Sequence, residues 1–154
     1  MVYTDTDSYV IKVETDDIYE DFKEINEYMD FSDYPAEHPN HDKSNKKVVG
    51  KFKDEMNGRI ISHFIGLKPK AYCYKVYGDE REHKKSKGVV KHKVINQLSY
   101  KIYEETLNRN YKEEINFNTI RSKNHQIYSY WYSDFESLPF GHYAIKYLHN
   151  EQMI

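Results

Sequence analysis

Alternating apolar and polar positions predict β-structure at the start of the chain. Residues 1–14 alternate and are rich in Tyr, Thr, Val and Ile, and a tight turn is predicted near residues 5–8. Apolar residues then recur at helical spacing, at Ile18, Phe22, Ile25 and Met29. Two acids, Asp16 and Asp17, precede this run, and acids are favoured at helix N-termini. The pattern predicts a hairpin followed by an amphipathic helix of about three turns.

The middle of the chain predicts further strands after a loop over residues 30–45, which is rich in Pro, Asn and Ser. Three β-type runs follow, at residues 48–56, 60–67 and 70–77. Asn57-Gly58 separates the first two, and Asn-Gly between apolar runs is a strong hairpin signal. Lys68-Pro69 separates the second from the third. We therefore expect an antiparallel arrangement in this region.

The last third of the chain predicts a smaller set of elements. They are a short strand over 85–90, a helix over 97–108, a second hairpin within 113–138 and a turn at 138–141. The whole pattern predicts a mixed α+β protein, with antiparallel strands and an amphipathic helix in residues 1–88 and a small mixed module in residues 89–154.

Composition indicates a thin core and excludes several classes of protein. Val, Ile, Leu and Phe together number only 34 of 154 residues, but the low net charge of -2 and the 16% aromatic content argue against disorder. No run approaches the roughly 18 apolar residues of a membrane span, and Met1–Val10 lacks the features of a signal peptide. The single cysteine, Cys73, allows no intrachain disulfide. We expect an intracellular, reducing compartment and no membrane partner.

Charge is distributed unevenly along the chain. Residues 1–42 carry 13 acids and 2 bases, whereas residues 43–93 carry 5 acids and 15 bases. In the basic part the lysines are interleaved with tyrosines, which suits a polyanion such as nucleic acid. A solvated lysine face that balances the neighbouring acidic segment explains the same pattern equally well.

Asp5 and Asp7 are the first candidates for chemistry. Residues two apart in a strand share a face, so the two carboxylates could project together and hold a hard divalent cation such as Mg²⁺. An Asx-type turn, in which both acids accept hydrogen bonds from backbone amides, is the alternative.

The hexapeptide Tyr3-Thr4-Asp5-Thr6-Asp7-Ser8 resembles the third palm motif of family B DNA polymerases, and later segments resemble later motifs in the same order. Val49–Glu55 resembles the next palm strand, Gly66–Tyr72 the Lys-x-Tyr motif between palm and thumb, and Lys84–Val89 the lysine-glycine element beyond it. Ile120–Lys123 and Leu138–Tyr143 resemble the closing segment of protein-primed polymerases of Polinton (Maverick) transposons and related viruses. The resemblance covers most of the chain.

The resemblance implies a role for each matching residue. Asp7 would be a principal ligand of a catalytic pair of Mg²⁺ ions, and Asp5 would support that site. Three further residues fall in the motifs that contact primer-template DNA, namely Lys70, Tyr72 and Lys85. Lys87 and Gly88 would lie where the base of the thumb approaches the duplex backbone. Lysine charges and tyrosine hydroxyls suit phosphate contacts that carry no sequence information.

The resemblance also implies partners and a location. They are primer-template DNA, deoxynucleoside triphosphates, a terminal protein that serves as primer and the remainder of the polymerase, at the nucleus or a viral replication site. The alternative is a non-catalytic nucleic-acid-binding remnant of such an enzyme. A plain interaction domain, in which the aspartates form only a turn, predicts no DNA binding.

Three further features have simpler explanations. His38 and His41 lie in a proline-bearing loop, where ordinary polar residues are commoner than zinc ligands. Cys73 lies in a β-type run and is expected to be a buried thiol rather than a nucleophile. The aromatic segment Ile127–Tyr132 could stack on single-stranded bases, although such alternation more often packs one face of a sheet.

We predict that purified residues 1–154 do not extend a primer on a template. The sequence begins two residues before the hexapeptide, so nothing in it corresponds to the first palm motif, the fingers lysine or an exonuclease domain. In-line transfer needs both metal ions and a positioned triphosphate, and two aspartates hold a cation only weakly. A primer-extension assay with Mg²⁺ checks this, and template-dependent extension would contradict it.

Overall fold

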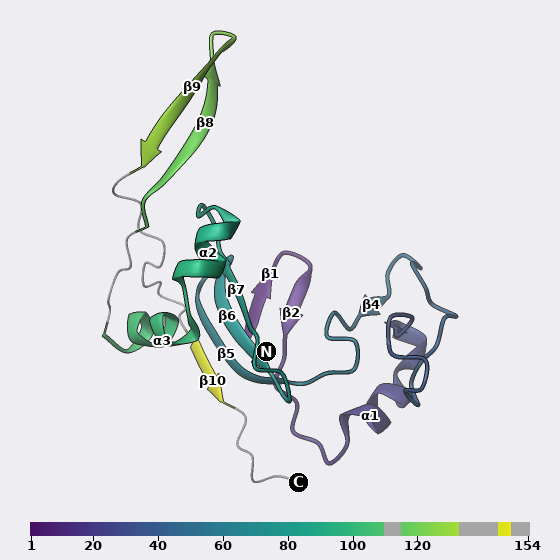
Figure 1. The fold of residues 1–154 in the computed structure, drawn as a ribbon. Helices are drawn as coiled ribbons and strands as arrows, with labels where there is room; N and C mark the ends of the chain where they lie inside the picture. Colours follow the sequence, from purple (N-terminus) through teal and green to yellow (C-terminus); the bar gives the residue numbers. More distant parts are fainter. Residues whose placement is uncertain (110–114, 133–144, 149–154) are drawn as a thin grey trace. The chain divides into compact units, whose positions relative to one another are not determined.

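The computed structural model describes residues 1–109, 115–132 and 145–148 and shows a mixed α+β protein, as the sequence predicts. The chain forms two compact units, one of residues 1–10 with 61–154 and the other of residues 11–60 (Figure 1). The predicted boundary near Gly88 lies within the first unit, and the division into a palm part and a thumb-like part stays a prediction. None of the described helices is long and apolar enough to cross a bilayer.

The first unit begins with the predicted hairpin. Strands β1 (Tyr3–Asp5) and β2 (Ser8–Val10) are antiparallel, and Asp5 lies opposite Ser8. Thr6 and Asp7 therefore form the turn, with Thr6 in the left-handed region at φ 62°. The Ser8 hydroxyl closes it by donating a hydrogen bond of 3.0 Å to the Asp5 carbonyl.

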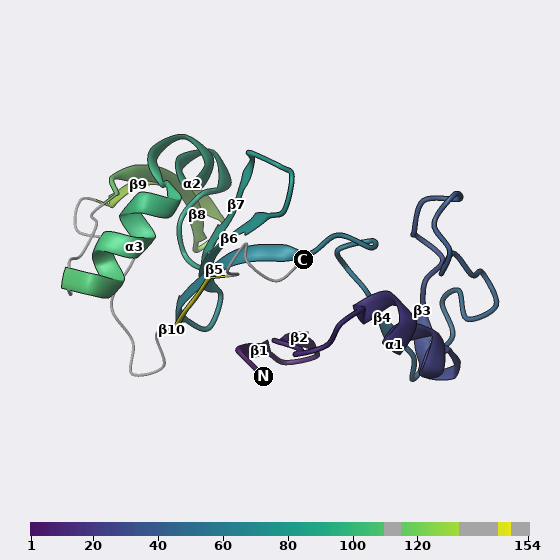
Figure 2. The same cartoon turned by 90° about the horizontal axis from the view of Figure 1, so that it is seen from below.

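A four-stranded antiparallel sheet forms the centre of the same unit (Figures 1 and 2). Its order is β10 (Ile145–Leu148), β5 (Ile61–Lys68), β6 (Ala71–Val76) and β7 (Glu82–Ser86). The strand predicted over 85–90 begins three residues earlier, at Glu82, and ends at Ser86. It ends there because the chain turns at Lys87-Gly88, where Gly88 has φ 96°. Strand β10 was not predicted.

Two helices, α2 (Lys91–Gln97) and α3 (Tyr100–Arg109), pack on one face of this sheet (Figure 2). The buried core comprises Ile65, Leu67, Cys73, Val94, Leu98, Tyr100, Tyr103 and Ile115. Ile65 and Leu67 contribute to it from alternate positions of β5, as the period of a strand requires, and Cys73 contributes from β6. The opposite face carries the intervening residues, among them Tyr72 and Tyr74.

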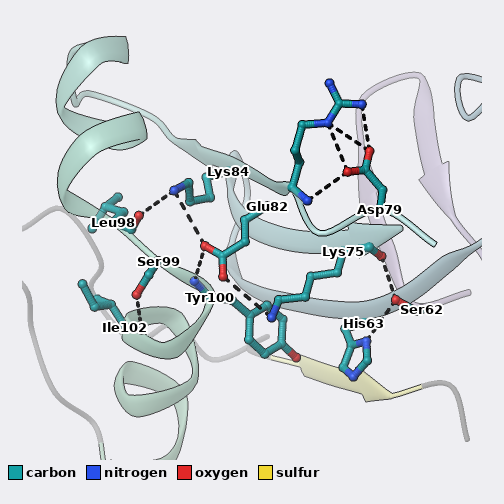
Figure 3. Close-up of polar contacts among 11 residues, drawn as sticks. Ser62, His63, Lys75, Asp79, Glu82, Lys84, Leu98, Ser99, Tyr100 and Ile102 are labelled. Carbon is teal, nitrogen blue, oxygen red and sulfur yellow. Dashed lines mark hydrogen bonds and ion pairs between the residues drawn. The ribbon is translucent and has the colours of Figure 1, made fainter. Parts of the chain in front are cut away.

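The helix predicted over 97–108 is confirmed as α3, which begins at Tyr100 because the chain breaks at Leu98-Ser99, whereas α2 was not predicted. Leu98 is extended, and the Ser99 hydroxyl accepts the Ile102 N–H at 3.4 Å. The adjoining strand stabilises both helix ends (Figure 3). Lys84 Nζ donates to the carbonyls of Ile95 and Leu98, at 3.1 and 2.6 Å.

Glu82 provides the second half of this arrangement. One of its carboxylate oxygens accepts the Tyr100 N–H at 2.9 Å, at the start of α3. The same carboxylate lies 3.7 Å from the ammonium groups of both Lys84 and Lys75 (Figure 3). Charges on the helix-facing side of β7 therefore satisfy the exposed backbone groups at two helix ends, where those groups have no partner within the helix.

The second unit is built from short elements. Helix α1 (Ile18–Glu24) is capped by Asp17, whose carboxylate accepts the N–H groups of Tyr19 and Glu20. This confirms the acidic cap, but the helix has only seven residues and continues as a 3₁₀ turn, η1 (Asn26–Tyr28). Asn26, the first residue of the 3₁₀ turn, donates a hydrogen bond from its side-chain amide to the Asp42 carboxylate at 3.1 Å.

The predicted hairpin at Asn57-Gly58 is wrong. Of the strand expected over 48–56 only β4 (Phe52–Lys53) forms, and it pairs in parallel with β3 (Met29–Asp30) rather than with β5. Asn57 and Gly58 do take the left-handed conformations that a hairpin turn needs, at φ 55° and 77°. However, the Asp54 carboxylate closes this turn by accepting the N–H groups of Met56 and Gly58 at 2.8 and 2.9 Å.

The second predicted hairpin is confirmed. Strands β8 (Phe117–Lys123) and β9 (Gln126–Tyr132) are antiparallel and pair from Phe117–Tyr132 to Lys123–Gln126. Asn124 and His125 form the turn with φ 53° and 59°, the left-handed pair that suits the twist of a two-residue hairpin. The turn predicted at 138–141 lies outside the described residues.

We predict that Lys84→Met destabilises the first unit and that Lys85→Met does not. The Lys84 side chain is only 13% exposed and donates to two helix-end carbonyls, so its loss should lower the free energy of unfolding by about 1–3 kcal/mol. Lys85 is its exposed neighbour on the other face of β7, and its replacement should cost less than about 0.5 kcal/mol. Urea unfolding followed by circular dichroism measures both, and equal losses would contradict the two-faced strand.

Candidate nucleic-acid interface

Tyr3 attaches the N-terminal hairpin to the turn between β5 and β6. Its hydroxyl accepts the Lys70 N–H at 2.7 Å, and its ring centroid lies 5.5 Å from that of Phe64 and 5.3 Å from that of Tyr72. Burial raises the pKa of the Tyr3 phenol, so the hydroxyl stays protonated. A Cβ at Gly66 would lie 3.0 Å from the Phe64 ring and 3.3 Å from the Tyr3 ring, so a side chain at this position would crowd both rings.

This attachment brings Asp5 to Lys70. Asp5 Oδ1 lies 3.6 Å from Lys70 Nζ, and the Asp5 side chain is 17% exposed. Asp7 lies in the exposed turn and has no hydrogen-bond or ion-pair partner among the described residues. The structure therefore places one of the two predicted aspartates against the basic region and leaves the other at the tip of the hairpin.

The predicted DNA-contacting residues lie around the same turn. Tyr72 and Lys85 are opposite each other on β6 and β7, with Lys85 Nζ 6.0 Å from the Tyr72 ring centroid. The Lys87 N–H donates to the Lys70 carbonyl at 2.9 Å. Lys85, Lys87 and Gly88 are exposed. Residues separated by up to 18 positions in the chain thus gather where β5, β6 and β7 turn.

Tyr72 is suited to donate a hydrogen bond to a phosphate. Burial is the main reason that its pKa is raised, and the nearby Tyr74, Tyr3 and Asp5 add smaller effects in the same direction. The phenol consequently stays protonated at neutral pH, with an O–H available as a donor. Lys85 places positive charge 6.0 Å from the Tyr72 ring centroid.

An aromatic row runs across the same face of the sheet, from the fully buried Phe64 to the half-buried Tyr72, Tyr74 and His83. Ring centroids lie 6.0 Å apart for Phe64 and Tyr72, 6.3 Å for Tyr72 and Tyr74, and 4.7 Å for Tyr74 and His83. The last pair is parallel within 3°, and His83 Nε2 is buried without a hydrogen-bond partner. The sequence patterns assign no role to Tyr3 or His83. The alternation of Tyr72 and Tyr74 in β6 was a signal for the row, but the pairing of His83 depends on strand register.

The donors present suit Mg²⁺ in kind but supply only part of a site. Mg²⁺ is commonly held by one or two carboxylates together with water and substrate phosphates. Asp5 and Asp7 could provide such carboxylates, although the Lys70 ammonium already lies beside Asp5. Within residues 1–109, 115–132 and 145–148 no group of three His, Cys, Asp or Glu side chains is arranged to hold a metal ion.

His38 and His41 have structural contacts in the second unit. The Nδ1 atom of His38 accepts the Asn40 N–H at 3.1 Å, and its ring packs against Tyr34 with centroids 4.6 Å apart. His41 Nδ1 lies 2.9 Å from the Tyr34 carbonyl, so it acts as the donor there. These contacts favour the interpretation as polar loop residues.

Cys73 is fully buried in the core beneath the sheet. Burial raises the pKa of its thiol to about 12, which opposes formation of the reactive thiolate at neutral pH. This supports the interpretation as a small apolar core residue.

A pocket of about 300 Å³ elsewhere in the unit is lined by Met1, Val2, Tyr3, Thr4, Lys68 and Pro69, and includes neither predicted aspartate.

No protein-family model, curated protein or solved structure matches the chain.

Proposed function

We propose that the chain supplies the end of the palm and the thumb of a protein-primed family B DNA polymerase of the Polinton (Maverick) or related viral type. The observation that supports this most strongly is the gathering of Asp5, Lys70, Tyr72 and Lys85 around one turn of the first unit. These residues come from three motifs that the sequence resemblance selects independently. Pairing of β6 with β7 is enough to bring Lys70, Tyr72 and Lys85 together, whereas Asp5 comes from a distant motif and reaches Lys70 through the N-terminal hairpin.

In this proposal the lysines and Tyr72 contact the primer-template backbone. Lys70, Lys85 and Lys87 supply point charges to phosphates, and the Tyr72 hydroxyl donates a hydrogen bond. Such contacts hold a duplex in place without reading its sequence, which is what a replicative enzyme needs. Lys70 also offsets the negative charge of Asp5, which would otherwise repel a phosphate.

The catalytic part of the proposal concerns Asp5 and Asp7. These carboxylates would hold Mg²⁺ together with ligands from the rest of the polymerase, and that ion would neutralise phosphate charge during nucleotidyl transfer. Asp7 is the principal candidate because its side chain is exposed at the turn. The role of Asp5 is to support the site and to position Lys70.

A second candidate function is a non-catalytic nucleic-acid-binding remnant of such a polymerase. The 3.6 Å ion pair between Asp5 and Lys70 favours it, because a carboxylate paired with an ammonium is a poorer ligand for a cation. Both candidates predict binding of duplex DNA. They differ in whether Asp7 matters for chemistry.

We predict that the chain binds duplex DNA with an affinity that falls steeply with salt. Each lysine–phosphate contact contributes about -0.9 to the slope of log affinity against log salt, so Lys70→Ala should flatten the slope by about one. Fluorescence anisotropy of a labelled duplex over a salt series measures this. Lys101→Ala is the matched control, since Lys101 is an exposed lysine of α3, on the other side of the sheet. A salt-independent affinity, or equal effects of the two variants, would contradict the interface.

In a full-length polymerase that contains this segment, Asp7→Asn should abolish nucleotide transfer and leave primer-template affinity nearly unchanged. The substitution removes a carboxylate ligand but keeps the size and exposure of the side chain. Primer extension and duplex anisotropy on the same preparation separate the two effects. Normal extension by the variant would contradict the catalytic role of Asp7.

A further inference from the structure

The β8–β9 hairpin exposes side chains that strands usually bury. Ile120 and Ile127 are 74% and 77% exposed, and Tyr128 and Tyr130 are 41% and 37% exposed. Every described side chain from residue 120 to residue 130 is exposed. A two-stranded hairpin without a covered face is at best marginally stable in water, so this one has surface to offer to a partner.

Strand register separates the hairpin into two different faces. Thr119 lies opposite Tyr130, Arg121 opposite Tyr128 and Lys123 opposite Gln126, so these residues share one face. Ile120 and Ile127 belong to the other face. We name the first the Tyr128–Tyr130 face.

The Tyr128–Tyr130 face combines flat rings with positive charge. The two ring centroids lie 6.3 Å apart, and the Arg121 guanidinium lies 5.9 Å from the Tyr130 ring centroid. Lys123 adds a second cation on the same face, and no Asp or Glu occurs between residues 115 and 133. Such a surface is complementary to a polyanion that carries aromatic groups.

We propose that the Tyr128–Tyr130 face binds single-stranded DNA by stacking of unpaired bases on the two tyrosine rings. Arg121 and Lys123 contact the phosphates of the same strand. Every base has a flat face, so the binding is independent of sequence. The choice of DNA over RNA rests on the proposed function, in which the same chain contacts primer-template DNA.

The sequence alone left stacking and sheet packing open for this segment. Sheet packing requires a surface that covers the rings, whereas Tyr128 and Tyr130 are 41% and 37% exposed and their ring contacts with each other and with Arg121 lie within the hairpin. The positive charges of Arg121 and Lys123 favour an anionic partner over an apolar protein surface, which would offer these two side chains no ion pair.

The test compares chains that differ only in the rings. Tyr128→Thr/Tyr130→Thr keeps residues that favour strands but removes both rings, and should weaken binding of a labelled oligothymidylate of about 15 nucleotides by about tenfold or more. Tyr128→Phe/Tyr130→Phe keeps the rings and should stay within about twofold of the original chain. Ile120→Thr/Ile127→Thr changes the opposite face and should leave the affinity unchanged.

Each outcome separates this inference from the proposed function. Retained oligothymidylate binding by the Thr variant, or equal losses in the Thr variants of the two faces, would overturn the inference. Tighter binding of oligouridylate than of oligothymidylate would overturn the assignment to DNA. A shift from dimer to monomer in the Thr variant would show that a second copy covers the face, and would also overturn the inference. Absence of duplex binding together with the expected ring effect would count against the proposed function alone.

Discussion

The hydrogen bond from the Lys70 N–H to the Tyr3 hydroxyl is the contact on which the candidate interface depends. It joins residues 67 positions apart and holds a hairpin with strands of only three residues, which could not persist alone. The Tyr3 ring also packs on Phe64 and Tyr72, so ring contacts and the hydrogen bond hold the hairpin together. Attachment of the hairpin at Tyr3 places Asp5, two residues further along β1, 3.6 Å from the Lys70 ammonium.

The alternation of side chains along β7 separates stability from binding. Lys84 faces the helices and satisfies carbonyls at the end of α2, whereas Lys85 faces the opposite side and lies beside Tyr72. Two neighbouring lysines that look equivalent in the sequence thus have different physical roles. The same alternation in β6 sends Cys73 to the core and Tyr72 to the exposed face. One face of the sheet therefore packs against the helices and forms the core, while the other face carries the residues of the candidate interface.

Local signals predicted those elements whose structure is decided locally. Both hairpins and the Asp17 helix cap follow from turn and capping chemistry within a few residues. The Asn57-Gly58 hairpin failed because Asp54 offers the turn a carboxylate and β4 finds a partner in β3. The helix over 97–108 formed as α3, but the separate helix α2 was missed, because Lys84 and Glu82, distant in sequence, stabilise two helix ends around Leu98-Ser99. For the site, motif residues such as Lys70 and Tyr72 were predictable, but the role of Tyr3 depends on a contact that no local pattern encodes.

The most direct test of the account is zero-length carbodiimide coupling of the native chain, followed by mass spectrometry of its peptides. This reagent joins a carboxylate to an amine only where the two are in contact. The account predicts a link between Asp5 and Lys70 that persists in Asp7→Asn, disappears in Asp5→Asn and is absent when coupling is done in denaturant. A native chain in which Lys70 couples to other acids and never to Asp5 would contradict it.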